Sequence, residues 1–333
     1  MDLSQFHYHL PESSIAQQPL ADRAASRMLV LHRGERRWED RTFRDFPQFL
    51  HADDCLVLND SKVFPSRLYG TRVGFSGAVE VLLVQPLSED AKTWTALVHP
   101  GRKMRTRERV AFDGPASEKV EAEVIGRGAY GERTLRFHYD GDLYELLRRI
   151  GHVPLPPYIK RPDTGEDRER YQTVFARETG SVAAPTAGLH FTGEILDASR
   201  KAGADIAYVT LHVGLGTFQP VRGEALHAER FHVDPENEAK IRAAQRVICA
   251  GTTSVRTVES LFLGKSGETD LFIRPGFEFQ RTNAMLTNFH LPKSSLLMLV
   301  CAFAGRDFVL SAYEHAVQAG YRFYSYGDCM LIV

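Results

Sequence analysis

Hydrophobic residues follow different spacings along the chain. Short apolar runs at 28–32 and 55–59 have the length of buried strands. From residue 63 to about 138 the chain becomes a series of brief β-type runs separated by Gly, Pro and charged turns, which is typical of a small barrel or sandwich. A helical pattern at 142–150 then leads into a proline-rich connector at 151–157. This connector is a natural boundary between two parts of the chain.

Beyond residue 150, helical and strand patterns alternate. Thr192 can cap one helix, and Gly305 can end another. The predicted helices are 194–202, 234–245, 255–263, 294–304 and 307–319, and the predicted strands are 205–213, 246–250, 271–275 and 277–279. Alternation of this kind indicates a layered α/β domain. We therefore predict an α/β fold with a discontinuous layered main domain, residues 1–62 and 150–333, and a small inserted β-barrel domain at residues 63–149.

Composition limits the class of protein. The chain has 333 residues, of which 43% are hydrophobic, and this is enough for two domains with real cores. Its formal net charge of −1 excludes nucleic-acid binding through bulk positive charge. A nucleic-acid partner therefore needs a local basic patch.

The cysteines and the apolar runs bear on the compartment. Cys55, Cys249, Cys301 and Cys329 lie far apart without a C-x-x-C pair, and we expect reduced thiols in a core. The first residues lack a secretory pattern, and the longest apolar run, 296–304, is far shorter than the about 20 residues of a membrane-spanning helix. We therefore expect a cytoplasmic protein without a membrane partner.

The segment 181–192 combines small residues with a predicted helix start. Such a loop lets the backbone approach a ligand closely and directs free N–H groups at it. A compact capping loop would account for Thr192 and Gly188 but leaves His190 without a role. Thr186, Gly188 and His190 are therefore candidate site residues.

His212 stands in an apolar strand immediately before a glycine turn. Gly214 and Gly216 begin like a dinucleotide-binding loop, but Gln219 occupies the position of the third glycine, so a tight turn explains the glycines alone. A single His in a strand is equally well a hydrogen-bonded core residue. Because ligands of α/β proteins bind at the carboxyl ends of strands, His212, Gly214 and Gly216 are candidates for the site.

Three hydroxyl residues follow the predicted strand 246–250. The side chains of Thr252, Thr253 and Ser254, together with the unpaired N–H groups of a helix N-terminus, can bind a carboxylate or a phosphate. Arg256 follows within the same helix. An N-cap needs only one of the three hydroxyls, so we predict a ligand-binding loop.

Polar side chains lie among large apolar ones in the segment 286–295 and near the C-terminus. This mixture is the composition of a small-molecule pocket. Asn288 and Asp328 taken singly could be turn residues. Together with His290 and Tyr326 they are better explained as walls of a pocket.

A basic stretch, residues 101–110, bears on the question that net charge leaves open. The stretch has one acidic residue, Glu108. Its basic residues are Arg102, Lys103, Arg105, Arg107 and Arg109. On alternate strand positions, the last three would share one face of the inserted β domain and could meet phosphates. The alternative is an ordinary edge strand that charge guards against pairing.

Together these segments closely resemble the S-adenosylmethionine:tRNA ribosyltransferase-isomerases of queuosine biosynthesis. The matching segments run in order along nearly the whole chain and are 8–11, 15–17, 26–27, 57–60, 99–103, 181–192, 210–222, 251–260, 286–300 and 321–328. The long motifs, such as SVAAPTAGLHFT and LTNFHLPKSSLLMLV, are very specific. The family is similar in fold to an α/β domain with an inserted small β-barrel.

The resemblance also implies a reaction. The family moves the ribosyl part of S-adenosylmethionine onto the aminomethyl group of 7-aminomethyl-7-deazaguanine at the wobble position of tRNA. The product is epoxyqueuosine, with release of adenine and methionine. The resemblance implies S-adenosylmethionine as co-substrate, no metal and no further cofactor. We expect a monomer that takes this tRNA as its partner.

Such a reaction needs a base for the proton next to the sulfonium and a donor for the departing adenine, and His or buried Asp serves best. We expect proton transfers from His190, His212, His290 and Asp328, without assigning each role. The residues expected to bind substrate are Thr186, Gly188, Gly214, Gly216, Thr252, Thr253, Ser254, Arg256, Asn288 and Tyr326. Among these, the hydroxyl loop and Arg256 would hold the methionine carboxylate or a tRNA phosphate. The residues expected to contact the tRNA backbone are Arg102, Lys103, Arg105, Arg107 and Arg109.

The chain departs from the family pattern at one place that bears on mechanism. Where the pattern reads H-x-M-H-x-E, this chain has Glu229 in place of the first His and keeps His232 and an acid. Two other classes of function stay open. One is a metal-dependent hydrolase, argued from His7, His9 and His227 with Glu229 and His232. The other is a non-catalytic tRNA-binding module.

Overall fold

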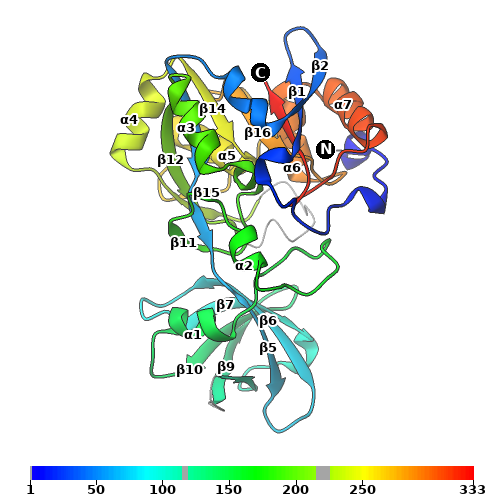
Figure 1. Ribbon diagram of the computed structural model, residues 1–333. Coiled ribbons are helices and arrows are strands. Elements are labelled where there is room, and N and C mark those ends of the chain that lie inside the picture. The colour runs from blue at the N-terminus through cyan, green and yellow to red at the C-terminus, as the bar shows by residue number, and fades with distance from the viewer. Residues whose placement is uncertain (1, 115–118, 215–225) are drawn as a thin grey trace.

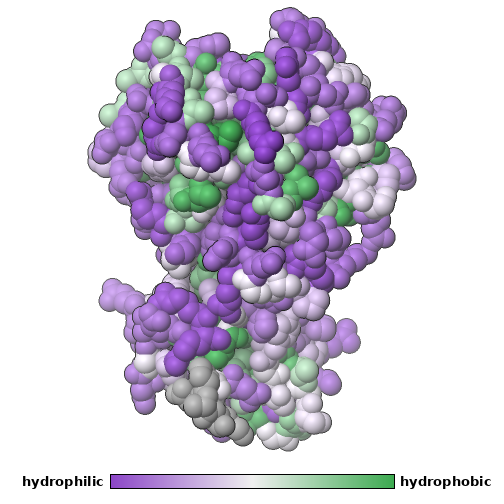
Figure 2. Space-filling view, in the orientation of Figure 1, coloured by the Kyte–Doolittle hydropathy of each residue, from purple (hydrophilic) through white to green (hydrophobic). Residues whose placement is uncertain are grey.

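The computed structural model describes residues 2–114, 119–214 and 226–333. Figure 1 shows an α/β part, which holds both ends of the chain, and a β-barrel formed by the cyan and green middle of the sequence. The predicted fold class, α/β with an inserted small barrel, is confirmed. On the face shown in Figure 2, hydrophilic residues predominate and hydrophobic ones form small separate groups.

The α/β part is built on a sheet that contains nine strands of the described residues, in the order β15-β13-β12-β3-β14-β16-β17-β1-β2. These strands are β1 (Arg27–His32), β2 (Arg37–Thr42), β3 (Asp54–Asn59), β12 (Asp205–Leu211), β13 (Glu229–His232), β14 (Arg246–Ala250), β15 (Glu268–Thr269), β16 (Ala284–Asn288) and β17 (Cys329–Ile332). β12, β3, β14 and β16 run parallel, whereas β17 is antiparallel to β16. Every residue of β3 is buried, as expected for a central parallel strand with both faces covered.

Helices cover both faces of this sheet. The elements that do so are α3 (Gly193–Lys201), α4 (Pro235–Ala243), α5 (Thr252–Phe262), α6 (Ser295–Ala304), α7 (Arg306–Gln318) and the 3-10 helices η4 (Phe43–Phe49) and η7 (Thr186–His190). Cys55 and Val57 of β3 belong to the core under α4, α5, α6 and α7. Leu56 and Leu58 belong to the core under α3, η4 and η7. The strand thus alternates its side chains between two cores.

The five helices predicted beyond residue 150 are confirmed. Thr192 Oγ1 accepts a hydrogen bond from Ile195 N at 3.3 Å at the start of α3, as an N-cap residue should. Gly305, with a φ of 87°, ends α6, and the chain bends by 114° into α7. Among the residues that the structure describes, no single helix is long and apolar enough to cross a membrane, and α6 with α7 meets that test only as a bent pair.

The two strands predicted within residues 271–279 are wrong. These residues form no strand, because Gly276, with a φ of 97°, turns the chain between the two apolar runs. The rings of Phe277 and Phe279 meet edge to face with centroids 5.1 Å apart, and Phe279 packs against Phe303 of α6. The apolar pattern here therefore reflects packing onto a helix rather than pairing in a sheet.

Six strands close into the barrel, in the order β10-β7-β6-β5-β8-β9. They are β5 (Arg67–Arg72), β6 (Ala78–Pro86), β7 (Thr93–His99), β8 (Arg109–Asp113), β9 (Lys119–Arg127) and β10 (Glu132–His138). Trp94 is fully buried in the barrel core against Phe64 and Tyr144 of α1 (Leu143–Ile150). A Cβ at Gly70 would lie 2.5 Å from the Ala111 carbonyl oxygen, so β5 and β8 approach closely only with glycine there.

A short parallel pair, β4 (Ser61–Val63) and β11 (Glu178–Ser181), joins segments on either side of the barrel in sequence. In α2 (Asp167–Arg170), the Asp167 carboxylate accepts hydrogen bonds from Arg161 at 2.7 and 2.8 Å and from the Tyr326 hydroxyl at 2.7 Å. These contacts fasten the segment after the barrel to the C-terminal part of the chain. We propose residues 63–149 as the inserted domain, because they contain β5 to β10 and nearly all of α1.

Candidate active site

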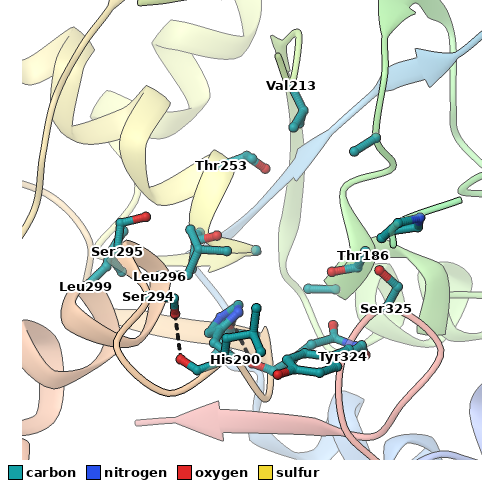
Figure 3. A pocket seen from close by; sticks show the side chains of 18 of the residues that line it. Thr186, Val213, Thr253, His290, Ser294, Ser295, Leu296, Leu299, Tyr324 and Ser325 are labelled. Carbon is teal, nitrogen blue, oxygen red and sulfur yellow. Dashed lines mark hydrogen bonds between the residues drawn. The ribbon is translucent and has the colours of Figure 1, made fainter. Parts of the chain in front are cut away.

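A cavity of about 500 Å³ lies at the edge of the main sheet where β12, β14 and β16 end. Its walls come from segments far apart in the sequence: the start of η7, the start of α5, the loop between β16 and α6, and the loop before β17. Figure 3 shows Thr186, Thr253, His290 and Tyr324 around this space. Because ligands of α/β proteins bind at the carboxyl edge of the sheet, this cavity is the candidate active site.

The structure brings together about half of the predicted catalytic and substrate-binding residues. Those that line the cavity are Thr186, Thr252, Thr253, Arg256, Asn288 and His290. Gly214 lies one hydrogen bond away, because its N–H donates at 3.0 Å to Glu229, which does line the cavity. Those that do not line it are Gly188, His190, His212, Ser254, Tyr326 and Asp328. Gly216 lies outside the described residues.

His290 is the predicted catalytic residue that faces the cavity. It follows β16, and its ring Nε2 lies 2.7 Å from Thr287 Oγ1. Its backbone N–H donates to the Tyr313 hydroxyl at 3.2 Å, which fixes the residue against α7. Burial lowers the pKa of His290 to about 3, because the charged imidazolium would lose its hydration. The imidazole is therefore neutral near pH 7.

His190 lies behind the cavity wall rather than in it. Its Nδ1 is 3.0 Å from Ser26 Oγ, and its ring packs against Phe43. Burial lowers the pKa of His190 to about 4, and the Asn288 side chain opposes this shift. Asn288 itself lines the cavity and donates from Nδ2 to the Tyr324 carbonyl oxygen at 2.9 Å.

His212 was predicted inside a strand, but β12 ends at Leu211, and the His212 ring packs on β11. A Cβ at Gly180 would lie 2.9 Å from two atoms of the His212 ring, so glycine is required for this contact. Burial and then the nearby Arg230 lower the pKa of His212. This ring therefore takes up a proton less readily than an exposed histidine does.

Three further candidates make contacts that account for them structurally. A Cβ at Gly188 would lie 2.8 Å from the Thr173 side chain, so this glycine serves close packing. The Tyr326 hydroxyl is bound to Asp167, as described above. The Asp328 carboxylate accepts hydrogen bonds from Arg27 N at 3.0 Å and Arg322 N at 2.8 Å, and burial raises its pKa. Asp328 thus ties the start of β1 to the segment before β17.

The start of α5 has the predicted hydroxyl loop, but its members differ in orientation. Ser254 Oγ donates to the Ala250 carbonyl oxygen at 2.8 Å and is fully buried. Thr253 Oγ1 accepts from Asn59 Nδ2 at 3.1 Å and, with Thr252, reaches the cavity wall. Arg256 is already ion-paired with Glu229. These four residues therefore do not form a simple anion site together.

Sequence reasoning missed several residues of the cavity wall. Tyr158 and Tyr324 form an aromatic pair with ring centroids 4.5 Å apart, and the Tyr158 hydroxyl lies 2.6 Å from Ser325 Oγ. The prolines before Tyr158 pointed only to a connector. Glu229 was noted as a departure from a family pattern and as part of the metal-site alternative, and its place two residues before Phe231 on the buried face of β13 was the signal that its side chain is buried.

The prediction that Arg105, Arg107 and Arg109 alternate along one strand is wrong. β8 begins at Arg109, and the residues before it form a turn in which Arg107 has a φ of 73°. Glu108 is held by Arg72 through hydrogen bonds of 2.6 and 2.7 Å, and this pairing fixes the turn. Arg109 itself pairs with Glu121 at 2.9 Å.

Four exposed cations of this stretch have no ion-pair partner among the described residues. They are Arg102, Lys103, Arg105 and Arg107. Arg102 also lines a second hollow, of about 590 Å³, on the barrel, together with Arg127 and Tyr130. Across residues 2–114, 119–214 and 226–333, no three His, Cys, Asp or Glu side chains converge to hold a metal ion.

Comparisons with known proteins cover the whole of this architecture. The model of a family described as queuosine biosynthesis protein matches residues 3–332. A protein of Solibacter usitatus named S-adenosylmethionine:tRNA ribosyltransferase-isomerase is 61% identical, and one of the same name from Symbiobacterium thermophilum is 49% identical. Both matches cover 100% of this chain and 100% of the relative.

A solved structure agrees with these relatives. The crystal structure of an S-adenosylmethionine tRNA ribosyltransferase from Thermotoga maritima is 38% identical in sequence, with a TM-score of 0.56. The match covers 99% of this chain and 100% of that one. With the family model, the full-length relatives and the cavity built from its longest motifs all in agreement, the chain belongs to the family of queuosine biosynthesis proteins.

Proposed function

We propose that this protein transfers and isomerises the ribosyl part of S-adenosylmethionine onto 7-aminomethyl-7-deazaguanine at the wobble position of tRNA. The products are epoxyqueuosine-tRNA, adenine and methionine. The observation that supports this most directly is that five motifs shared with the family converge on one cavity of about 500 Å³. S-adenosylmethionine is then a co-substrate, and no further cofactor is part of the proposal. The enzyme would act in the cytoplasm, as a monomer.

Within this reaction, we assign His290 the role of a hydrogen-bond donor. A pKa of about 3 makes its imidazole a weak base but leaves a neutral N–H donor at neutral pH. If Thr287 donates to Nε2, the proton of His290 is on Nδ1 and can be offered to a ligand. The departing adenine needs such a donor. His190, which contacts no cavity space, acts as a positioning residue through Asn288.

For the tRNA, we propose that Arg102, Lys103, Arg105 and Arg107 contact the phosphate backbone. Their support is exposure, positive charge and the lack of an ion pair in the described part of the chain. Phosphate contacts of this kind position a nucleic acid without reading its sequence. Arg109 is removed from the proposed contact surface, because Glu121 already neutralises it.

The experiment that tests the function mixes the protein with S-adenosylmethionine and tRNA that carries the deazaguanine precursor. We expect adenine release and a change in mass of the wobble nucleoside to that of epoxyqueuosine. A reaction without tRNA is the control and should release no adenine. Unchanged tRNA with intact S-adenosylmethionine would contradict the proposal and favour a non-catalytic tRNA-binding module.

A further inference from the structure

A buried ion pair forms part of the cavity wall. Glu229 of β13 and Arg256 of α5 are bound to each other, are only 7% and 6% exposed, and both line the cavity. Glu229 also accepts from Gly214 N at 3.0 Å. Arg256 donates from Nε to the Leu271 carbonyl oxygen at 3.1 Å and from Nη2 to that of Thr269 at 3.4 Å. Both side chains are thus held in fixed positions.

Neither member of the pair is saturated by these contacts. A guanidinium has five N–H donors, and Arg256 uses three of its own in hydrogen bonds to described residues. A carboxylate offers about four acceptor sites, and Glu229 receives two hydrogen bonds from described residues. Buried ion pairs contribute little net stability compared with well-packed apolar residues. Stability is therefore a weak reason for placing this pair at the wall of a binding cavity.

The charges of the pair restrict what can bind beside it. A phosphate would be attracted by Arg256 but repelled at short range by the Glu229 carboxylate, and a purely cationic group would meet the opposite conflict. A ligand that carries both an ammonium and a carboxylate group satisfies both side chains with charge-assisted hydrogen bonds. The end of an α-amino acid is such a ligand.

We propose that Glu229 and Arg256 together bind the amino-acid end of S-adenosylmethionine, with Arg256 on its carboxylate and Glu229 on its ammonium group. This assignment rests on the proposed function. It names the ligand of the α5 segment as the methionine end of the co-substrate rather than a tRNA phosphate. It also gives Glu229 a role as a substrate-binding residue.

The test measures equilibrium binding of three ligands without tRNA: S-adenosylmethionine, its decarboxylated analogue and its deaminated analogue. We expect the wild type to bind S-adenosylmethionine at least about tenfold more tightly than either analogue, because each analogue leaves one charged partner unmatched. In the double variant Glu229→Gln/Arg256→Gln, both differences should fall to within about twofold. Glu229→Gln alone should remove only the discrimination against the deaminated analogue.

The control is an ion pair outside the cavity, Asp54 with Arg246, whose closest atoms are 2.6 Å apart. The variant Asp54→Asn/Arg246→Gln should keep wild-type discrimination. Unchanged discrimination in a folded Glu229→Gln/Arg256→Gln variant would overturn the assignment. Equal affinity of the wild type for all three ligands would also overturn it, even if the double variant fails to fold. Failure of the proposed function is distinct, since the wild type would then release no adenine in the presence of tRNA.

Discussion

At the scale of the residue, burial sets the protonation state of the cavity. His290 and His190 are both enclosed, and the loss of hydration holds the pKa of His290 at about 3 and that of His190 at about 4. Neither ring therefore changes charge near pH 6.5, where an exposed histidine does. If the cavity receives the sulfonium cation of S-adenosylmethionine, as proposed, a neutral His290 adds no second positive charge beside it.

The first prediction concerns the rate. His290→Ala should lower the turnover number for adenine release by about 100-fold or more, because the variant loses the proposed hydrogen-bond donor to the leaving adenine. The wild-type rate between pH 5 and 8 should show no step that belongs to His290, since this side chain is already neutral there. A step near pH 6.5 that disappears in His290→Asn would contradict this interpretation.

The second prediction concerns stability. Because the pKa of His290 and His190 is lower in the folded than in the unfolded state, the unfolded chain binds more protons between about pH 4 and the ordinary value of 6.5. The free energy of unfolding should therefore fall as the pH is lowered through this window. Melting temperatures at a series of pH values should show this fall, and His190→Asn/His290→Gln should flatten it. Equal slopes in both proteins would count against it.

Single residues also show how far sequence reasoning reaches. Asn288 and His290 were found because they are polar side chains among large apolar ones in one specific motif, and both line the cavity. The partner of Arg256 was not found, because Glu229 comes from a different strand and the pair exists only once β13 and α5 are packed. Asp328 was expected in the cavity, but its carboxylate binds two backbone N–H groups elsewhere. Local composition gives no information on such distant pairings.

At the scale of the element, local backbone structure decides which basic side chains form ion pairs and which stay unpaired. The basic stretch was expected to be a strand because its charges alternate, but the Arg72–Glu108 pair and the left-handed Arg107 make a turn before β8. Arg102 and Lys103 are exposed in the 3-10 helix η5 (Gly101–Lys103), and Arg105 is exposed beside the turn. Arg109, in contrast, enters the strand and pairs with Glu121. Alternation of charge alone cannot distinguish these two cases.

The third prediction follows from this difference. The variant Arg102→Ala/Lys103→Ala/Arg105→Ala should weaken tRNA binding and make its dependence on salt shallower by roughly 2 in the slope of log K against log salt. Arg109→Ala is the matched control and should change the slope by less than about 0.5, because its charge is already paired. Binding titrations at several salt concentrations measure both. Identical slopes for the triple variant and the wild type would mean that these three cations form an ordinary solvated surface and do not contact tRNA.

At the scale of the whole molecule, the chain has separate hydrophobic cores. Local sequence patterns predict the type of each domain but not the order of its strands. The alternation of helices and strands indicated the α/β part, and short strands indicated the barrel. The order of the strands in the main sheet depends on contacts such as β3 between β12 and β14, which join residues about 150 to 190 positions apart. The formal net charge of −1 is a sum over the whole chain and therefore does not show the exposed basic stretch on the barrel.

The last prediction uses this separation. Trp94 belongs to the barrel core, and in the part of the chain that the structure describes this core has no buried residue in common with the cores on either face of the main sheet. Trp94→Ala should destabilise the barrel by about 3–5 kcal/mol and weaken tRNA binding, because the barrel carries the exposed cations. S-adenosylmethionine binding should change by less than about twofold, since the cavity lies in the α/β part. In Trp94→Ala, hydrogen exchange should show faster opening in β5 to β10 than in β3, β12 and β14. The control variant Trp94→Phe keeps most of the side-chain volume and should still bind both ligands. Equal loss of both ligands in Trp94→Ala would mean that the two parts unfold as one unit, and the barrel could not then be treated as a separate domain.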